Sequence, residues 1–299
     1  MSDRTEANLT AAVLARLDGV SDARFRQIMT CLVKHLHAFV RETDLTDAEW
    51  FEGIQFLTAT GKKCDEKRQE YILLSDTLGV STLVDAINHG KPTGATESTV
   101  LGPFFVQGAP DMPTGANIAE GVTGEPTYFS GAVRSTDGAP IVGATLDIWS
   151  TDGAGQYDVQ RPGGELRARG RITTDAHGHY AFWTVKPVSY PVPTDGPVGT
   201  MLLKMGRHPY RPAHTHMIVS APGYEPVTTH LFVKGDPYLE SDAVFAVKDS
   251  LVVDFVPHQP GVAPDGKQVD QPWWTVQYDF RLPRARASSA HAGRHNAHT

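Results

Sequence analysis

Two histidines one residue apart are the sharpest chemical signal in the sequence. His214 and His216 lie in the segment Arg-Pro-Ala-His-Thr-His-Met-Ile-Val, which runs from Arg211 to Val219. In a β-strand, residues i and i+2 point to the same face, so both imidazoles could reach one metal ion. Imidazole suits zinc, copper, iron and nickel, so the spacing favours a metal site without choosing the metal. The alternative is two ordinary histidines on a solvated strand face.

Two tyrosines upstream lie in segments whose backbone is unusual. Tyr157 follows the glycine-rich residues 153–156, and Tyr190 precedes three prolines within residues 191–197, which fix the backbone there. Taken singly, each tyrosine is typical of a half-buried strand or loop residue. Phenolates are nevertheless hard anionic donors, and a strong Lewis acid such as Fe(III) can hold them deprotonated at neutral pH.

In this order, the three segments resemble the signature of the intradiol ring-cleavage dioxygenases. The resemblance extends over roughly residues 20–282, and Leu73–Asp76 (LLSD) and Glu97–Phe104 (ESTVLGPF) also carry it. It implies a non-haem Fe(III) centre, one per subunit, that opens a catechol-type ring with O₂ between the two hydroxyl-bearing carbons. The metal ligands that it implies are Tyr157, Tyr190, His214 and His216.

The resemblance also implies roles for single residues. Tyr190, as the ligand that the substrate displaces, would act as a base for a substrate proton. Arg211 would stabilise anionic character on the ring, because a guanidinium stays charged under all working conditions; the alternative is a surface arginine. His230 lies fourteen residues after His216, at a position that is often glutamine in the catechol-cleaving branch. We expect it to be an outer hydrogen-bonding partner of the ligands.

The substrate pocket that the resemblance implies is mostly apolar and fits a flat aromatic ring. Its expected members are Leu73, Asp76, Val100, Leu101, Gly102, Pro103, Phe104, Val192, Pro193 and Arg211. Asp76 stands out, because an acid facing an apolar slot is costly unless something hydrogen-bonds to it. An additional ring hydroxyl would do so, and the branch that cleaves hydroxyquinol (benzene-1,2,4-triol) carries such a carboxylate. The expected product is 3-hydroxy-cis,cis-muconate, the tautomer of maleylacetate. Catechol and chlorocatechol are the alternative substrates, and Asp76 could instead cap a helix turn.

Two interpretations from other classes remain open on the sequence. Residues 130–183 share a pattern with transthyretin-like β-sandwiches, many of which only bind or connect. A zinc hydrolase on a sandwich is a second alternative, although tyrosinates are poor zinc ligands beside His, Cys and Asp or Glu.

The elements that must position these residues fall into two halves. From Asn8 to Gly90 the apolar spacing is helical, proline is absent from residues 1–91, and the sequence around Thr46 and Glu49 predicts a helix-starting capping box. One apolar stripe consists of Phe25, Ile28, Met29, Leu32, Val33, Leu36, Phe39 and Val40. We expect a helical domain at residues 1–95. The resemblance implies that it forms a homodimer and can hold a phospholipid.

After Pro92 the residue pattern changes to short apolar runs between turn signals. This pattern predicts an antiparallel β-sandwich over residues 96–283 and an α+β fold overall. The predicted strands are 127–134, 142–149, 178–184, 200–204, 214–220, 227–234, 250–256 and 274–281. Residues 284–299 lack apolar periodicity and are expected to be disordered. The tail histidines His291, His295 and His298 are a weaker metal candidate.

Charge and cysteine content narrow the remaining possibilities. The net charge of -7 argues against nucleic acid or anionic membrane surfaces as partners. The two cysteines do not suggest a disulfide framework, and the first residues do not read as a signal peptide. No stretch is long and apolar enough for a membrane span, so we expect a cytoplasmic enzyme acting on a small aromatic diol or triol and O₂.

Overall fold

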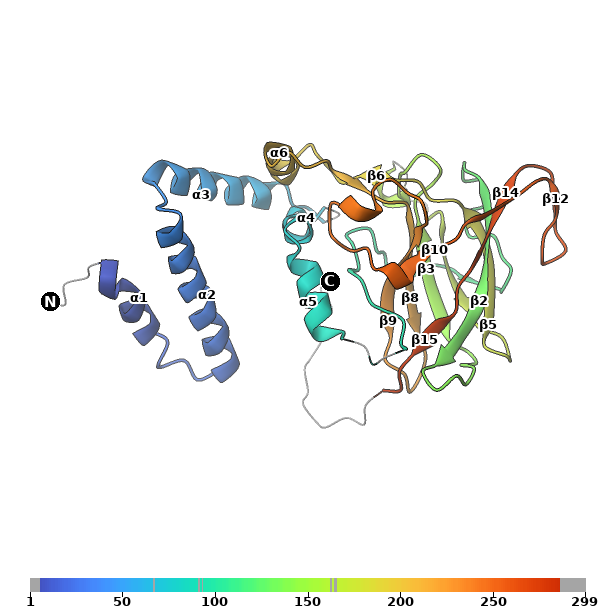
Figure 1. Ribbon diagram of the computed structural model, residues 1–299, viewed down its shortest axis with the longest axis horizontal. Coiled ribbons are helices and arrows are strands. Elements are labelled where there is room, and N and C mark those ends of the chain that lie inside the picture. Colours follow the sequence, from blue (N-terminus) through green and yellow to red (C-terminus); the bar gives the residue numbers. More distant parts are fainter. Residues whose placement is uncertain are drawn as a thin grey trace. The chain divides into compact units, whose positions relative to one another are not determined.

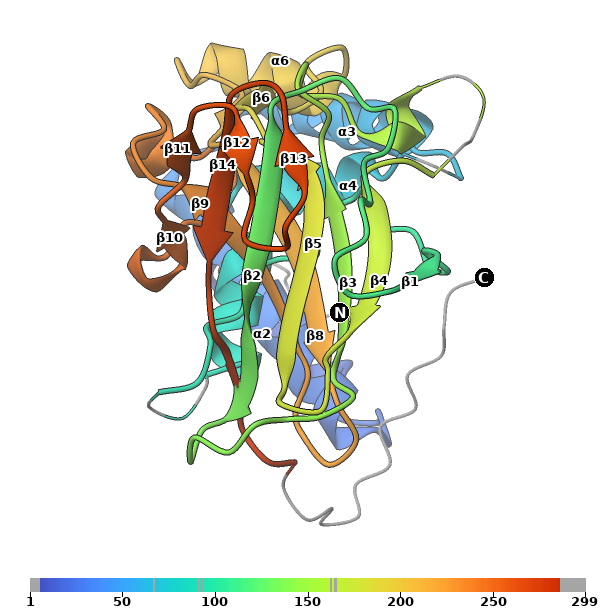
Figure 2. The ribbon, with the colours of Figure 1, turned by 90° about the vertical axis from the view of Figure 1, so that its right-hand side faces the viewer.

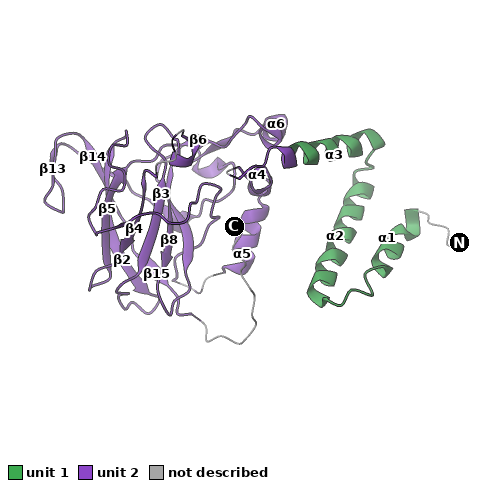
Figure 3. Cartoon of the chain, turned by 180° about the vertical axis from the view of Figure 1, so that it is seen from behind, with its two compact units in different colours: residues 1–59 green, residues 60–299 purple. Residues whose placement is uncertain are grey.

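The computed structural model describes residues 6–66, 68–90, 92, 94–161, 163 and 166–285. The chain divides into two compact units, residues 1–59 and residues 60–299 (Figure 3). The first unit holds α1 (Glu6–Ala15), α2 (Ala23–Glu42) and most of α3 (Asp47–Lys62). The predicted boundary between residues 95 and 96 stays a prediction. Residues 286–299 lie outside the described residues. The expected disorder of the tail and the metal site of its histidines therefore stay predictions.

The predicted capping box is present at the start of α3. The Thr46 backbone N–H donates to Glu49 Oε2 at 3.0 Å, and the Glu49 N–H donates to Thr46 Oγ1 at 3.3 Å. The predicted apolar stripe lies on α2 but is not buried in the single chain, because Leu32 is 47% exposed and Phe39 51% exposed. A stripe of this kind normally faces a core or a partner.

Among its described residues, the second unit contains the further helices α4 (Glu70–Thr77), α5 (Val80–Asn88) and α6 (Pro197–Lys204). The helical spacing expected from Asn8 to Gly90 is broken at Gly79, whose φ of 73° suits a residue without a side chain. The strand predicted at 200–204 is wrong, because these residues belong to α6, which Pro197 starts at a favoured position. Among the described residues, no helix is long and apolar enough to cross a membrane.

Two larger sheets lie face to face in the second unit (Figures 1 and 2). One has the order β1 (Asp111–Met112), β4 (Arg169–Thr173), β3 (Thr145–Ser150), β8 (His214–Ser220), β9 (Val227–Val233) and β10 (Val252–Val253). The other has the order β11 (Val256–His258), β14 (Trp273–Gln277), β2 (Pro126–Ser135) and β15 (Phe280–Leu282), with β5 (His179–Val185) also paired to β2. Two-stranded sheets join β6 (Tyr190–Pro191) to β7 (Tyr210–Arg211) and β12 (Gly261–Val262) to β13 (Gln268–Val269). Short 3₁₀ helices are η1 (Asp158–Gln160), η2 (Leu239–Ser241) and η3 (Asp249–Leu251).

The α+β fold class is confirmed, with one refinement of the strand directions. The strands that carry the site, β3, β4, β8 and β9, pair in antiparallel fashion, whereas β14 and β15 run parallel to β2. β4 was not predicted, because its sequence Arg-Gly-Arg-Ile-Thr contains a single large apolar residue. Aromatic rings fill the space inside the sheets, with Phe129 and Phe182 stacked at 4.9 Å between centroids. β8 lies in the interior of its own sheet, with a strand hydrogen-bonded on each side.

Candidate metal centre

The two histidines of β8 lie side by side in a buried position. The strand runs between β3 and β9, and His214 and His216 are 1% and 2% exposed. His214 Nδ1 is 2.7 Å from the Pro212 carbonyl oxygen, to which it donates, so its Nε2 is left with a free lone pair. Burial, with the nearby Arg211 charge, lowers the pKa of His214 to about 3, and burial also lowers the pKa of His216. Both rings are therefore neutral, which is the form that binds metals.

A glycine explains how Tyr157 reaches the site. Gly155 has a φ of 81°, and a Cβ built there would lie 3.1 Å from Tyr190 Cβ, so the loop can approach Tyr190 closely only with glycine at this position. The Tyr157 backbone N–H donates to Gln160 Oε1 at 2.9 Å, which fixes the start of η1. The Tyr157 side chain is fully buried. The glycine-rich stretch in the sequence thus has a packing reason.

A buried ion pair supports Tyr157 from behind. Arg169 donates from Nε to Asp158 Oδ2 at 2.6 Å and from Nη2 to Asp158 Oδ1 at 2.5 Å. The same Nη2 donates to the Phe104 carbonyl oxygen at 2.7 Å, and the Phe104 ring stacks on Tyr157 at 4.6 Å. Sequence reasoning missed this pair, because Arg169 belongs to the unpredicted strand β4 and nothing in the local pattern connects it to Asp158.

Tyr190 and Arg211 are direct cross-strand partners in the sheet of β6 and β7. Arg211 is 3% exposed and donates from Nε to Asp242 Oδ1 at 3.1 Å and from Nη2 to Asp242 Oδ2 at 3.4 Å. Its Nη1 lies 3.2 Å from His214 Nε2. Burial opposes the charge of Arg211, but the charge and hydrogen bonds of Asp242, together with the nearby phenol groups of Tyr190 and Tyr157, raise the pKa of the guanidinium overall. The surface alternative for Arg211 is therefore wrong, and Asp242 is a neighbour that the sequence analysis missed.

The four donor atoms converge on one point. Tyr157 Oη is 2.9 Å from His216 Nε2, 3.4 Å from His214 Nε2 and 3.4 Å from Tyr190 Oη. The two Nε2 atoms are 3.1 Å apart. Four donors at about 2.0–2.1 Å from a central ion would be separated by roughly 3.3 Å, so the spacing fits a metal ion. Burial and the neighbouring Tyr190 raise the pKa of Tyr157, and a bound cation would offset this cost of ionisation.

His230 completes a buried cluster of three histidines. It pairs with His216 across β8 and β9, and their ring centroids are 4.1 Å apart at an interplanar angle of 88°. Nitrogen atoms of His214, His216 and His230 lie within 4.8 Å of one another, close enough to hold a metal ion. Both ring nitrogens of His230 are buried without a hydrogen-bond partner. The expectation that His230 hydrogen-bonds around the centre stays a prediction.

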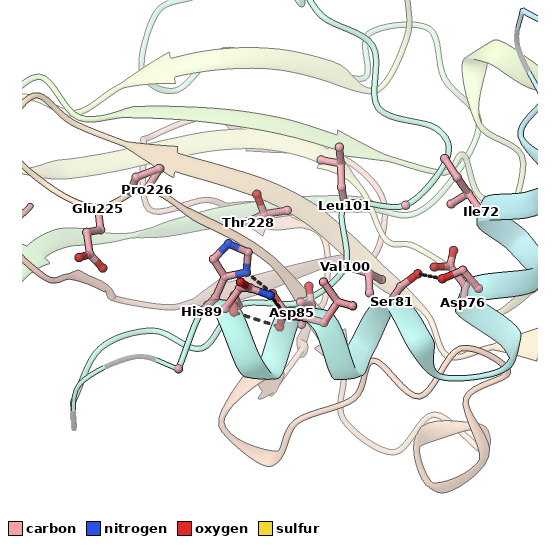
Figure 4. A pocket seen from close by; sticks show the side chains of 17 residues that line it. Ile72, Asp76, Ser81, Asp85, His89, Val100, Leu101, Glu225, Pro226 and Thr228 are labelled. Atoms are coloured by element: carbon pink, nitrogen blue, oxygen red, sulfur yellow. Dashed lines mark hydrogen bonds and ion pairs between the residues drawn. The ribbon is translucent and has the colours of Figure 1, made fainter. Parts of the chain in front are cut away.

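Four of the expected pocket residues line one cavity of about 780 Å³ in the second unit, namely Asp76, Val100, Leu101 and Gly102 (Figure 4). Asp76 is 4% exposed and accepts a hydrogen bond from the Ser81 hydroxyl. Burial raises the pKa of this carboxyl group, although Ser81 and Arg211 counteract the shift. None of the four expected ligands lines this cavity, but its lining residue Gly102 lies next to one of them, because a Cβ built on Gly102 would lie 3.1 Å from His216 Cε1.

Four others, Leu73, Pro103, Phe104 and Pro193, line a separate cavity of about 200 Å³. The two remaining members, Val192 and Arg211, are buried and line neither cavity. The residues expected to form one pocket are thus divided between two cavities, and the chain segment from Gly102 to Phe104 contributes to both. Trp149, which sequence reasoning did not single out, stacks on the His216 ring at 4.6 Å.

Comparisons with known proteins identify relatives over most of the chain. Residues 22–96 match a family model described as catechol dioxygenase N terminus, and residues 100–283 match a model described as dioxygenase. A 6-chlorohydroxyquinol 1,2-dioxygenase from Cupriavidus pinatubonensis is 52% identical over 87% of this chain and 95% of its own length. A hydroxyquinol 1,2-dioxygenase from a Rhizobium species is 48% identical over 93% of this chain and 96% of its own. The crystal structure of a hydroxyquinol 1,2-dioxygenase from Pseudomonas putida superposes with a TM-score of 0.88 at 49% identity, covering 94% of this chain and 99% of that one.

Proposed function

The chain belongs to the intradiol ring-cleavage dioxygenases, and from this premise we propose that it cleaves hydroxyquinol with O₂ to give 3-hydroxy-cis,cis-muconate, the tautomer of maleylacetate. The observation that carries the proposal is the convergence of two phenol oxygens and two imidazole nitrogens: Tyr157 Oη lies 2.9–3.4 Å from each of the other three donor atoms, and the two Nε2 atoms are 3.1 Å apart. Relatives at 48% and 52% identity that are described as acting on hydroxyquinols support the substrate. Family membership argues against the transthyretin-like binding module and the zinc hydrolase.

We propose Fe(III) as the metal, one ion per subunit, held by Tyr157, Tyr190, His214 and His216. Two anionic phenolates beside two neutral imidazoles favour a hard trivalent ion over zinc, for which tyrosinate is a poor ligand. When bound, this ion would withdraw electron density from the diolate and so activate a ring carbon toward O₂. Iron measured per chain by mass spectrometry tests the stoichiometry. A zinc-loaded or colourless active enzyme would contradict the proposal.

The protein's own residues would bind the diol and move its protons. Tyr190, 5% exposed and 3.4 Å from the Tyr157 hydroxyl, is the proposed acceptor of one diol proton at its Oη. Arg211 would oppose the negative charge that grows on the ring, because its Nη1 already faces the donor cluster. His230 would donate an N–H to a group bound at the centre, which would satisfy one of its two buried and unpartnered nitrogens.

Asp76 is the proposed recognition group for the third hydroxyl of hydroxyquinol. Its carboxyl group is buried on the wall of the larger cavity, where the apolar neighbours Val100 and Leu101 offer no hydrogen bond. Ser81 already donates one hydrogen bond to this carboxyl group, so a substrate hydroxyl would supply a further hydrogen bond that plain catechol lacks. Discrimination of this kind depends on the polar group in the site and gives large ratios between substrates.

Oxygen uptake by the iron-loaded enzyme with hydroxyquinol, catechol and 4-chlorocatechol tests the proposal. We expect a strong preference for hydroxyquinol that falls by about 5- to 150-fold in Asp76→Ala, because about 1.4 kcal/mol corresponds to tenfold and an unpaired buried group costs about 1–3 kcal/mol. Asp85→Asn is the matched control. Asp85 lines the same cavity but is already bonded to His89 and Ser98, so its change should leave the substrate ratio unaltered.

The possible outcomes separate the parts of the proposal. Equal or faster turnover of catechol by the wild type would keep the family's reaction and remove the role of Asp76. Preference for 4-chlorocatechol would favour the chlorocatechol alternative. No uptake with any diol by protein that contains iron would refute the enzymatic function.

We also propose that the helical residues 1–95 form a homodimer and that a phospholipid can bind there. The exposed apolar stripe of α2, with Phe25 52% exposed and Leu36 53% exposed, supports a partner of apolar character. Sedimentation should give twice the chain mass, and Leu36→Glu should reduce it to one chain; organic extraction with mass spectrometry tests for the lipid. A monomeric wild type would refute the dimer.

The free thiols of Cys31 and Cys64 support a cytoplasmic location, which cell fractionation tests.

A further inference from the structure

The guanidinium of Arg211 is held in one orientation by a carboxylate that lies far away in the sequence. Two of its nitrogens, Nε and Nη2, point to the two oxygens of Asp242 at 3.1 and 3.4 Å. The remaining nitrogen, Nη1, lies 3.2 Å from His214 Nε2 and so points to the donor cluster. Because the guanidinium is planar, fixing one side of it fixes the direction in which the other side points.

The carboxylate of Asp242 is itself fixed by the backbone that follows it. Oδ1 accepts from the Val244 N–H at 3.2 Å, and Oδ2 accepts from the Ala246 N–H at 3.0 Å. Within this turn Phe245 has a φ of 59°, an uncommon conformation for a residue with a side chain, which the surrounding contacts must maintain. Asp242 thus accepts four hydrogen bonds, two from the guanidinium and two from a specific backbone turn.

Further contacts hold the turn against the helices that border the larger cavity. Arg207 donates to the carbonyl oxygens of Thr77 and Ala243 at 2.6 and 2.8 Å. The Thr82 hydroxyl donates to the Val244 carbonyl oxygen at 3.0 Å. The turn is therefore tied to the end of α4 and to α5. Through this connection, Asp242 takes a position set by several elements, not by its own side-chain rotamer alone.

Stability alone does not account for this arrangement. Arg211 and Asp242 are 3% and 4% exposed, and a buried ion pair is often no more stabilising than apolar residues of similar volume. The pair does determine where the one uncommitted side of the guanidinium is directed. The negative charge of Asp242 also balances the positive charge of Arg211, which lies next to two neutral imidazoles. The guanidinium therefore does not repel a cation at the centre.

We propose that Asp242 is a positioning residue, which holds Arg211 through Nε and Nη2 so that Nη1 is presented to the diol bound at the metal centre. The inference rests on the proposed function of the site. It predicts that a positive charge at residue 211 is not sufficient and that its orientation by Asp242 is required. A lysine at residue 211 keeps the positive charge. Its single ammonium nitrogen cannot, however, pair with both oxygens of the Asp242 carboxylate as the planar guanidinium does.

A double-mutant cycle on the iron-loaded enzyme tests this inference. The variants are Arg211→Ala, Asp242→Asn, their combination, and Arg211→Lys. Glu240→Gln is the control, since it removes one acidic charge two residues away at an exposed position. We measure iron content, visible absorption, the anaerobic dissociation constant of the diol, and kcat for oxygen uptake. Thermal unfolding sets a common temperature at which all variants are folded.

In Asp242→Asn we expect kcat to fall about 10²-fold, the typical effect of losing one preorganised group that stabilises developing charge. Iron content and resting absorption should stay unchanged, and the anaerobic dissociation constant of the diol should change less than about threefold, because the orientation matters most as charge develops on the ring. The combined variant should be no slower than Arg211→Ala. Arg211→Lys should resemble Arg211→Ala, and Glu240→Gln should resemble the wild type.

Independent, multiplicative losses in the combined variant would overturn the inference, and so would a fully active Arg211→Lys. If wild-type protein that contains iron consumes no oxygen, the proposed function fails. The positioning role is then decided by a crystal structure of Asp242→Asn. Rotation of the Arg211 guanidinium away from His214 supports the role, and an unchanged orientation refutes it.

Discussion

Gly102 offers a direct test of how tightly the chain encloses the donor cluster. It lies on the wall of the larger cavity with a φ of 77°, and an added Cβ would approach His216 Cε1 to 3.1 Å. Gly108 has a φ of 87° but nothing within 4 Å of such a Cβ. The pair of variants Gly102→Ala and Gly108→Ala therefore separates backbone strain from contact with a metal ligand.

The two contributions can be given magnitudes. A residue with a side chain in the left-handed region costs about 1–2 kcal/mol, which applies at both positions. For a domain of this size, that lowers Tm by about 2–8 °C. At residue 102 alone, the added Cβ and His216 Cε1 would start 3.1 Å apart. Relaxing this distance to about 3.5 Å moves the His216 ring by roughly 0.4 Å. Ligand distances in metal sites tolerate only about 0.2 Å, so we expect Gly102→Ala to lose about 10–100-fold in iron affinity.

The assay is competition for iron with a chelator, followed by the visible absorption of the protein, with Tm measured in parallel. Gly108→Ala should show the Tm decrease with unchanged iron affinity. Wild-type iron affinity in Gly102→Ala would refute the reasoning, because it would mean that His216 has room to move. An equal loss of iron in Gly108→Ala would also refute it, because general destabilisation would then explain both.

Three further changes test the rest of the site. Arg169→Met leaves the buried Asp158 charge without its partner and should lower the free energy of unfolding by about 3–5 kcal/mol in denaturant titrations; a loss below about 1 kcal/mol would contradict the supporting role of the pair. Tyr157→Phe keeps the ring but removes the donor oxygen, so visible absorption and bound iron should both fall, and an unchanged spectrum would exclude Tyr157 as a ligand. Burial raises the pKa of Asp76 above 3.8, so the folded state binds the carboxyl proton more tightly than the unfolded state does. Wild-type stability therefore declines as pH rises from 3.8 through the raised pKa. Asp76→Asn should therefore be more stable than wild type above that window and similar below it; a stability difference that does not change with pH would contradict this.

The parts of the site that local sequence predicted are those set by short-range geometry. The i, i+2 spacing of His214 and His216 needs only a strand, and the structure contains that strand over the predicted residues. The capping box at Thr46 and Glu49 is equally local. The recognition of Tyr157 and Tyr190 came from motif resemblance, since no spacing rule connects a loop residue to a residue in a two-stranded sheet.

The parts that escaped prediction depend on tertiary contacts or on weak local signals. Asp242 lies 31 residues from Arg211, and nothing in either segment indicates the pairing. The apolar residues of α6 fit a buried strand as well as a short helix, and the packing of α6 on α4 decides between them. The break at Gly79 was hidden because a single glycine is tolerated inside a helical pattern.

The proposed metal donors come from distant points of the chain, because Tyr190 follows Tyr157 by 33 positions and His214 follows it by 57. An unfolded chain cannot keep such groups together, because closing each loop has an entropic cost. The centre therefore exists only after the sandwich has folded, and the proposed ion binds to a site that is already formed. Its binding then stabilises the folded chain by mass action. Protein prepared with a strong chelator and protein prepared with excess iron should thus melt at different temperatures while refolding at the same rate.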